Sequence, residues 1–321
     1  MSALLEVKEL TRSFDARRVV DQLSFSVSAG EAFGLLGPNG AGKSTTMMMI
    51  CGILEADSGT VTLAGEPLSG QDPNSRQRLG VVPQDLAIYP ELTARENLQF
   101  FGSLYHLPRP LLEERVNHAL QQVGLEGRAN DKAETFSGGM KRRLNFAAAI
   151  LHQPSVLILD EPTVGVDPQS RAHLMQCVRD LQQLGTAIIY CSHYMEEVEA
   201  LCARAAIIDH GKLLACDTVS GLLRQIPAEV EIRITGGSPV ADLREIAGLK
   251  LDESDGSDIR VLRFEQRVAT QQASETGDLS VAVADVLQAL AERQFHVLSI
   301  HTFEPSLERL FLKLTGARLR D

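Results

Sequence analysis

Residues 37–45 read GPNGAGKST, a stretch whose spacing is suited to holding phosphate. Glycines in the pattern GxxxxGK[ST] let successive backbone N–H groups turn inward around phosphate oxygens. We expect Lys43 to reach the terminal phosphates and the Ser44 hydroxyl to bind Mg²⁺. The competing interpretation, an ordinary glycine-rich turn, is disfavoured by the apolar strand before the loop and the helix after it. The predicted phosphate-binding residues are Gly37, Pro38, Asn39, Gly40, Ala41, Gly42, Lys43, Ser44 and Thr45.

An acidic pair closes a second apolar run, LILDEP at 157–162. A carboxylate at the end of such a strand is expected at the C-terminal edge of a sheet, where ligands of α/β sheets bind. A phosphate loop that hydrolyses ATP also needs a metal-binding carboxylate and a group that positions water. We assign Asp160 to Mg²⁺, through a water molecule, and Glu161 to the attacking water. Taken alone, the pair would also suit a helix cap or a solvated turn.

A further anion site is indicated by FSGGMKRR at 136–143, where Ser137 precedes Gly138 and Gly139 at the start of a predicted helix. The free N–H groups and the dipole of a helix start favour negative charge ahead of it. An isolated SGG is more often an ordinary serine N-cap.

The elements that must position these residues are strands alternating with helices. We expect strands at 4–8, 20–26, 31–37, 155–160 and 186–192, and helices at 43–52 and 169–184. This alternation predicts an α/β fold with a parallel sheet. A long insert, about 86–135, carries Leu, Glu and Arg at helical spacing and is interrupted by prolines, so it predicts a helical subdomain.

The pattern changes after residue 226 and predicts a separate, small α+β domain over 227–321. Its order is strand, helix, strand, strand, helix, strand, the ferredoxin-like succession, followed by a closing helix. The located elements are strands at 229–235, 259–265 and 295–303, helices near 240–247, at 281–293 and at 306–314, and a polar loop at 266–280. No cluster of residues in this domain suggests catalysis, so a role in stabilising a dimer or in regulation is a hypothesis.

Composition excludes several function classes. Among 321 residues, 42 acidic and 31 basic side chains give a net charge of −11, so the chain lacks the broad positive field of a non-specific nucleic-acid binder. No apolar run approaches the roughly 18 residues of a membrane span, and no signal-peptide pattern opens the chain. We interpret the five cysteines, Cys51, Cys177, Cys191, Cys202 and Cys216, as reduced packing residues, which favours a cytosolic compartment.

In its ordered motifs the sequence resembles the nucleotide-binding subunits of ABC transporters. The phosphate loop, Gln84, FSGGM, LILDEP, Asp167 and His193 follow one another in the order typical of that family, over about residues 4–225. FSGGM departs from the common LSGGQ at Phe136 and Met140 but keeps the serine and both glycines. The resemblance implies a P-loop ABC ATPase domain over 1–225, with a mixed core sheet and a helical subdomain at about 86–152.

Further roles are implied by this resemblance alone. Gln84 would sense Mg²⁺ and the γ-phosphate, His193 would contact the γ-phosphate, and both would join Glu161 in catalysis. Asp167 would couple two ATP sites, although an Asp before a Pro also suits a simple turn. Phe14 would stack on adenine, in competition with a place in the core. Without the ordered set, Gln84 and His193 would be taken as a solvated loop residue and a capping or surface residue.

The resemblance also implies an assembly. The chain has one phosphate loop, so a head-to-tail homodimer would complete each site, with Ser137, Gly138, Gly139 and Asp167 acting in trans. A groove formed largely by 89–105 would receive a helix of a separate membrane permease, unless its aromatic residues only pack the insert's own core. SGGMKRR, SHYMEE and PSLERLFLKLTG resemble the ABC-2 type exporters of drugs, polysaccharides and lipids. The expected location is the cytoplasm, on the inner face of the plasma membrane.

The sequence analysis therefore predicts an ATPase that uses ATP and Mg²⁺ to energise export. The first alternative is a soluble ABC ATPase that acts on nucleic acid or ribosomes. Relatives of that kind carry two nucleotide domains or a long coiled-coil insert, and the acidic charge disfavours it. The second is a small-molecule P-loop kinase, in which LILDEP beside FSGGM would have no purpose.

Overall fold

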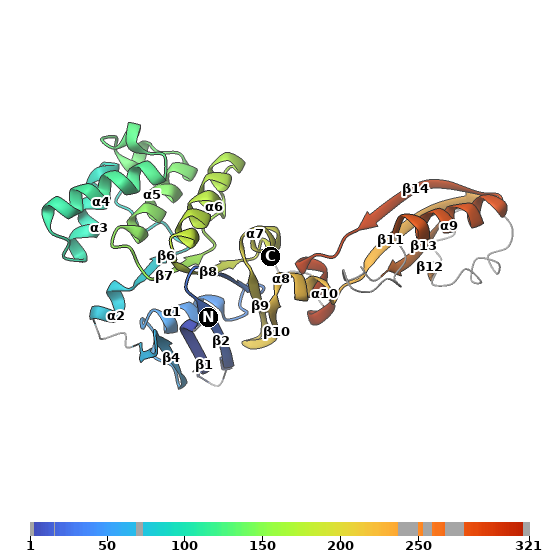
Figure 1. Cartoon of the computed structure of the whole chain (residues 1–321), viewed down its shortest axis with the longest axis horizontal. Helices are drawn as coiled ribbons and strands as arrows, with labels where there is room; N and C mark the ends of the chain where they lie inside the picture. The colour runs from blue at the N-terminus through green and yellow to red at the C-terminus, as the bar shows by residue number, and fades with distance from the viewer. Residues whose placement is uncertain are drawn as a thin grey trace. The chain divides into compact units, whose positions relative to one another are not determined.

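The computed structural model describes residues 3–15, 17–68, 73–236, 250–252, 259–266 and 279–316. The chain divides into two compact units (Figure 1). The first comprises the chain up to Val219 together with the chain from Phe311 onward, and the second is Ser220–Leu310. The domain boundary at 225–227 stays a prediction.

An antiparallel sheet opens the first unit, with the strand order β2-β1-β4-β5. Its strands are β1 (Ala3–Phe14), β2 (Arg17–Ser28), β4 (Ser58–Leu63) and β5 (Glu66–Pro67). Alternating apolar residues of β1 and β2 are fully buried, among them Leu5 and Val27, which pair across the two strands. The two short apolar alternations of the sequence are therefore one hairpin, which covers part of the core.

A six-stranded sheet holds the site, with the strand order β10-β9-β3-β8-β7-β6. Its strands are β3 (Ala32–Leu36), β6 (Leu79–Val82), β7 (Val156–Asp160), β8 (Ala187–Ser192), β9 (Arg204–Asp209) and β10 (Lys212–Thr218). All neighbours pair in parallel except β9 and β10. The central strands read as unbroken apolar runs because both faces of a parallel sheet are covered. The predicted α/β fold is confirmed.

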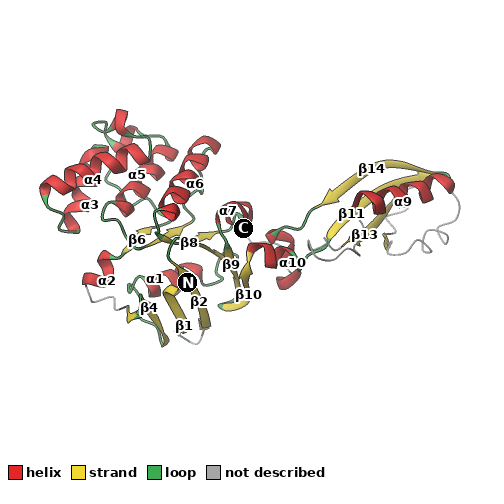
Figure 2. Cartoon of the chain, in the orientation of Figure 1, coloured by secondary structure: helices red, strands yellow, loops and turns green. Residues whose placement is uncertain are grey.

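The helices of the first unit connect these strands. They are α1 (Lys43–Ile50), α2 (Pro73–Gln77), α3 (Ala94–Leu104), α4 (Arg109–Gln122), α5 (Gly138–Ile150), α6 (Pro168–Gln183) and α7 (Met195–Leu201), with single 3₁₀ turns at Glu126–Arg128 and Ala133–Thr135. Figure 2 shows α3, α4 and α5 gathered together to one side of the strands. They form the helical subdomain that the insert predicted.

The second unit contains a four-stranded sheet in the order β12-β13-β11-β14, with every neighbouring pair antiparallel. This is the ferredoxin-like strand order. Its elements are β11 (Ala228–Gly236), β12 (Lys250–Asp252), β13 (Ile259–Gln266), β14 (Phe295–Phe303) and α9 (Leu279–Glu292), preceded by α8 (Val219–Leu223) and followed by α10 (Leu307–Thr315). The predicted helix near 240–247 and most of the loop at 266–280 lie outside the described residues.

Apolar residues of the sheet and α9 form the core of this second unit. They are Val230, Ile232, Ile234, Leu262, Phe264, Val286, Leu290 and Phe295. Figure 1 shows α9 running along one face of the sheet. The period of two along β11 therefore places its apolar residues beneath the helix.

All five cysteines are free thiols, but their environments differ. Cys177, Cys191 and Cys202 are buried and Cys51 is half-buried, as expected of packing residues. Cys216 is exposed, so the expected packing role is wrong there, because β10 lies at the edge of its sheet.

One fully buried amide organises the entry to the helical subdomain. The Asn97 side chain accepts a hydrogen bond from the Tyr89 N–H at 2.7 Å and donates to the carbonyls of Tyr89, Leu92 and Thr93. A capping box between Thr93 and Glu96 starts α3 directly after this turn. One side chain thus makes hydrogen bonds with three residues of the loop at 89–93.

We expect Asn97→Ala to lower the free energy of unfolding by roughly 1–3 kcal/mol, because it strands buried backbone groups of the 89–93 loop. Urea unfolding followed by circular dichroism measures this change. Gln99→Ala, a half-buried position on the same helix, is the matched control. An equal effect of the two substitutions would show that Asn97 has no special role.

Candidate functional site

The phosphate loop connects β3 to α1 and has the backbone geometry that its glycines predict. Gly40 and Gly42 have φ angles of +80° and +104°, in the left-handed region that glycine favours. A Cβ atom at Gly42 would lie 2.6 Å from the carbonyl oxygen of Val19. Lys43 is buried at the start of α1, and its Nζ donates to the carbonyl oxygens of Gly37 and Pro38, at 2.7 and 3.2 Å. The lysine side chain thus joins the end of the phosphate loop to its beginning.

This loop presents open donors. Among the described residues, no backbone carbonyl accepts from the N–H groups of Gly40, Gly42, Lys43, Ser44 or Thr45. No heavy atom lies within 4 Å of the position a Cβ would take at Gly40, so space remains beside the loop. Open N–H groups together with the positive end of α1 fit a bound phosphate chain.

Two oxygen donors suited to Mg²⁺ lie at the end of this loop. Ser44 Oγ donates to Asp160 Oδ2 at 3.2 Å, so the first residues of α1 meet the last residue of β7. Burial raises the pKa of Asp160, and the hydrogen bond from Ser44 opposes that shift. Within the described part of the chain no group of three His, Cys, Asp or Glu could hold a metal ion. The predicted magnesium ligands Ser44, Gln84 and Asp160 would, together with water and phosphate oxygens, give the kind of oxygen ligand set that Mg²⁺ takes in proteins.

The three predicted catalytic residues converge on one carboxylate. Glu161 is 6% exposed, and its backbone has the left-handed φ of +48°, which is costly for a residue with a side chain. Gln84 Nε2 donates to Glu161 Oε2 at 3.4 Å. His193 Nδ1 lies 3.2 Å from Glu161 Oε1 but outside hydrogen-bond geometry. A buried ring nitrogen is thus left without a hydrogen-bond partner among the described residues, beside the carboxylate assigned to water.

The residues expected to act in trans form a second cluster. Ser137 caps α5 by accepting from the Met140 N–H, and Asp167 caps α6 by accepting from the Ser170 N–H at 2.9 Å. This bond lowers the pKa of Asp167. A Cβ at Gly139 would lie 2.7 Å from Asp167 Oδ2, so glycine lets the two helix starts meet closely. No hydrogen bond or ion pair of the described residues joins this cluster to the phosphate loop.

Phe14 lies at the end of β1 and is 42% exposed. The Arg12 guanidinium stands 5.0 Å from the centre of its ring. Exposure excludes the alternative that Phe14 is a core residue, and it leaves the ring accessible to a planar ligand.

Two side chains that hydrogen-bond the Gln84 segment to α5 were not predicted from the sequence. Arg142 Nη1 donates to the carbonyl oxygen of Gln84, and Asn145 Oδ1 accepts from the Ala87 N–H at 3.1 Å. Asn145 carries a sequence signal, since it is the polar residue within the apolar run LNFAAAIL. Arg142 has no sequence signal apart from its place in the basic run KRR. These hydrogen bonds attach the Gln84 segment to α5, the helix whose N-cap is Ser137.

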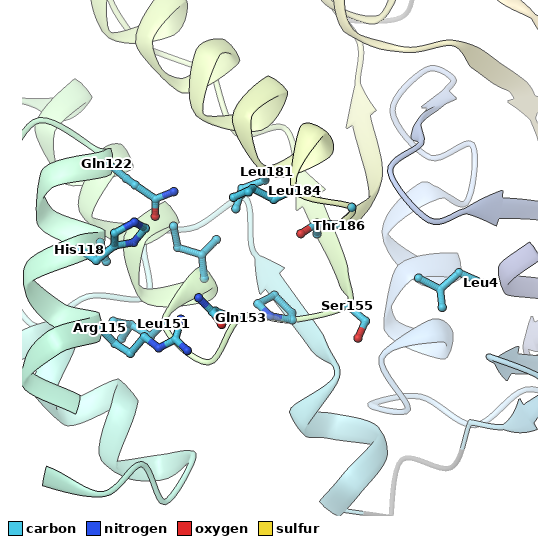
Figure 3. A pocket seen from close by; sticks show the side chains of 14 residues that line it. Leu4, Arg115, His118, Gln122, Leu151, Gln153, Ser155, Leu181, Leu184 and Thr186 are labelled. Carbon is cyan, nitrogen blue, oxygen red and sulfur yellow. The ribbon is translucent and has the colours of Figure 1, made fainter. Parts of the chain in front are cut away.

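A hollow of about 510 Å³ lies at the opposite end of the sheet. Figure 3 shows Arg115, His118 and Gln122 of α4 on one side of it and Ser155 and Thr186 on the other. These last two residues precede β7 and β8, whereas Glu161 and His193, both predicted to be catalytic, follow these strands. Since α/β sheets bind ligands at the carboxyl ends of their strands, this hollow is not the phosphate site.

Comparison with known proteins agrees with this geometry. Residues 20–164 match the family described as ABC transporter. The chain is 43% identical to the Linearmycin resistance ATP-binding protein LnrL of Bacillus subtilis (strain 168), over 99% of this chain and 100% of that protein. It is 38% identical to the Nod factor export ATP-binding protein I of Paraburkholderia xenovorans (strain LB400), over 99% of each.

A solved structure titled "Structure of ATP binding subunit of ABC transporter" aligns with a TM-score of 0.64 and 32% identity. The alignment covers 69% of this chain and 92% of that one. Fold, motif order and full-length relatives agree, and so this chain belongs to the ATP-binding proteins of ABC transporters and is an ATPase.

Proposed function

We propose that this ATPase energises export through a separate membrane subunit, by closing a homodimer on ATP and reopening it after hydrolysis. The observation that carries the proposal is the convergence of Ser44, Asp160, Glu161, Gln84 and His193 beside a loop with open N–H groups. The relatives' names support export as the direction of transport, since one is a Nod factor export ATP-binding protein and another is a linearmycin resistance ATP-binding protein.

The chain's own groups account for the steps of hydrolysis. The loop N–H groups and Lys43 hold the phosphates, with Lys43 exchanging its two carbonyl partners for phosphate oxygens. Ser44, Gln84 and Asp160, the last through a water molecule, would hold Mg²⁺, and the ion would supply positive charge that offsets the negative charge of the phosphate oxygens. Glu161 accepts a proton from the attacking water, and Gln84 and the free Nδ1 of His193 lie beside it to orient water and phosphate.

A second copy of the chain would complete each site. Ser137, Gly138, Gly139 and Asp167 are grouped together, yet none makes a hydrogen bond or ion pair with the phosphate loop of its own chain among the described residues. The start of α5 is a suitable anion site. A head-to-tail homodimer would place it against the phosphates held by the partner's loop, with Phe14 stacking on adenine.

The surface of the helical subdomain supports a membrane partner of the ABC-2 type. Phe100 packs edge to face with both Tyr89 and Phe101, with ring centres 4.9 Å apart for Tyr89 and Phe100. The rings of Tyr89 and Phe101 are tilted against each other. Leu86, Tyr89, Phe100 and Leu104 are exposed although they are large and apolar. We call these four residues the aromatic patch. Phe100 and Leu104 lie one helical turn apart on α3, and Tyr89 packs against Phe100, so exposed apolar side chains gather here, as is typical of an interaction site.

No described helix has the length and apolar character needed to cross a membrane. Because this chain is an ABC transporter ATP-binding protein, we place it in the cytoplasm, held to the inner face of the plasma membrane by the permease. The second unit would stabilise the dimer or regulate it. The net charge of −11 does not favour the alternative partners, nucleic acid and ribosomes.

Glu161→Gln tests the core of the proposal. We expect it to keep ATP affinity and to lower turnover by roughly 10²–10⁴-fold, because the amide cannot accept the proton of water. With ATP and Mg²⁺ it should elute as a dimer in size-exclusion chromatography with light scattering. Wild-type protein without Mg²⁺ is the control. Turnover close to wild type would contradict the assignment of Glu161.

The same variant, purified from native membranes with ATP and Mg²⁺, tests the export function. We expect one polytopic membrane protein to copurify in equal amounts. Recovery of ribosomes or nucleic acid would instead favour the non-transport alternative and leave the ATPase assignment intact.

Phe100→Ala tests the aromatic patch. We expect at least a roughly tenfold loss of copurifying membrane protein, since a buried aromatic anchor carries much of an interface's energy. The ATPase activity of the isolated subunit should stay within about twofold of wild type, because the ring contacts and hydrogen bond of Phe100 are with Tyr89, Phe101 and Ser103 and not with the predicted catalytic residues. Leu184→Ala, an exposed apolar position elsewhere on the first unit, is the matched control. Equal losses for both variants would refute the patch as a specific site.

The raised pKa of Asp160 predicts a pH effect on Mg²⁺ binding. Burial favours the protonated acid, so the charged form is lost at higher pH than for an ordinary carboxyl group with a pKa of about 3.9. We expect the apparent Mg²⁺ affinity, measured with a fluorescent nucleotide, to weaken as pH falls from about 7 toward 5. Asp160→Asn removes the titrating group and should give a flatter profile. If Mg²⁺ affinity changed with pH in the same way in both proteins, Asp160 would not be the group responsible for the pH dependence.

A further inference from the structure

A buried carboxylate lies behind the catalytic residues. Glu197, in the first turn of α7, is 3% exposed. Tyr190 Oη donates to its Oε2 at 2.8 Å, and the Thr163 hydroxyl lies 2.8 Å from both carboxylate oxygens. A buried charge is tolerated only when it is paired and hydrogen-bonded. These contacts, with Arg171 at 3.4 Å from Oε1, meet that requirement.

The same carboxylate reaches the segment that holds His193. Ser192 Oγ lies 3.4 Å from Glu197 Oε2 and accepts from the Tyr194 N–H at 2.9 Å. Arg171, paired with Glu197, stands 5.0 Å over the Tyr194 ring. That ring lies 4.1 Å from the imidazole of His193. The residues on both sides of His193 are therefore linked to Glu197: Ser192 directly, and Tyr194 through Arg171.

Two loops meet at this carboxylate. Thr163 follows Glu161 by two residues, and Ser192 directly precedes His193. The Glu161 backbone is strained, with a positive φ, and such a conformation persists only where surrounding contacts hold it. Thr163 anchors the far side of that turn, since its carbonyl also accepts from the Val166 N–H at 3.2 Å.

We propose that Glu197 is a positioning residue for hydrolysis, which holds the Glu161 loop and the His193 loop in one fixed relation. Its side-chain partners are Thr163, Tyr190, Ser192 and Arg171, and it makes no hydrogen bond or ion pair with Glu161 or His193 among the described residues. Its effect passes through Thr163 on one side and through Ser192, Arg171 and Tyr194 on the other. The proposal rests on the catalytic roles given above to Glu161 and His193, and it does not depend on export.

Purified Glu197→Gln and Thr163→Val test this role through turnover and binding together. Misplacing a catalytic group by about 1 Å can cost roughly 100-fold in rate. We expect each variant to lower kcat at least tenfold, while the Kd for ATP stays within threefold. The double variant should lose no more than the worse single variant, because both act on one network.

Glu196→Gln is the matched control, since it removes the same charge from the same turn of α7 at an exposed position. It should leave kcat unchanged. A kcat within twofold of wild type in folded Glu197→Gln, equal losses in kcat and ATP binding, or additive losses in the double variant would each overturn the proposal. If Glu197→Gln does not fold, Thr163→Val and Tyr190→Phe, which each remove a single hydroxyl, decide the question. Wild-type turnover in the same assay separates this outcome from a failure of the ATPase itself.

Discussion

Parallel pairing of β3, β8 and β7 is the constraint on which the site depends. Leu36 at the end of β3 pairs with Ser192, and Asp160 at the end of β7 pairs with Cys191. This register brings three strand ends to one edge, so the segments that follow them must lie side by side. The Glu161 N–H then donates to the Cys191 carbonyl at 2.9 Å. A slip of one residue in either pairing would separate the carboxylates from the loop and turn alternate side chains to the other face.

The helical subdomain connects to this edge through polar contacts of the Gln84 segment. Arg142 and Asn145, both on α5, hold that segment by its backbone, while the Gln84 side chain reaches Glu161. A movement of α5 would therefore be transmitted to the carboxylate through a short chain of bonds. The proposed partner surfaces, the start of α5 and the aromatic patch, both belong to this subdomain. Binding at either surface can thus change the position of Gln84 relative to Glu161 while the central sheet stays as it is.

Local signals made much of this fold predictable. The phosphate loop, LILDEP and the strand at 186–192 each carry their information in a few consecutive residues, and their places in the sheet follow from rules for parallel strands. The ferredoxin-like order of the second unit followed from the succession of elements, although the three-residue strand β12 was too short to locate. Arg142 and Glu197 were not found, because their importance arises from contacts between segments that are distant in the sequence. Cys216 was misjudged because an apolar neighbourhood does not reveal that a strand is an edge.

The division of the chain into units has a consequence for its synthesis. The first unit includes the chain from Phe311 onward, so about ninety residues of the second unit interrupt it. At roughly 5–20 residues per second, a ribosome needs on the order of 5–20 s to make that interruption. During this interval the second unit can begin to fold as it emerges, while the first still lacks its last segment. The first unit is therefore the first to begin but the last whose residues are all synthesised.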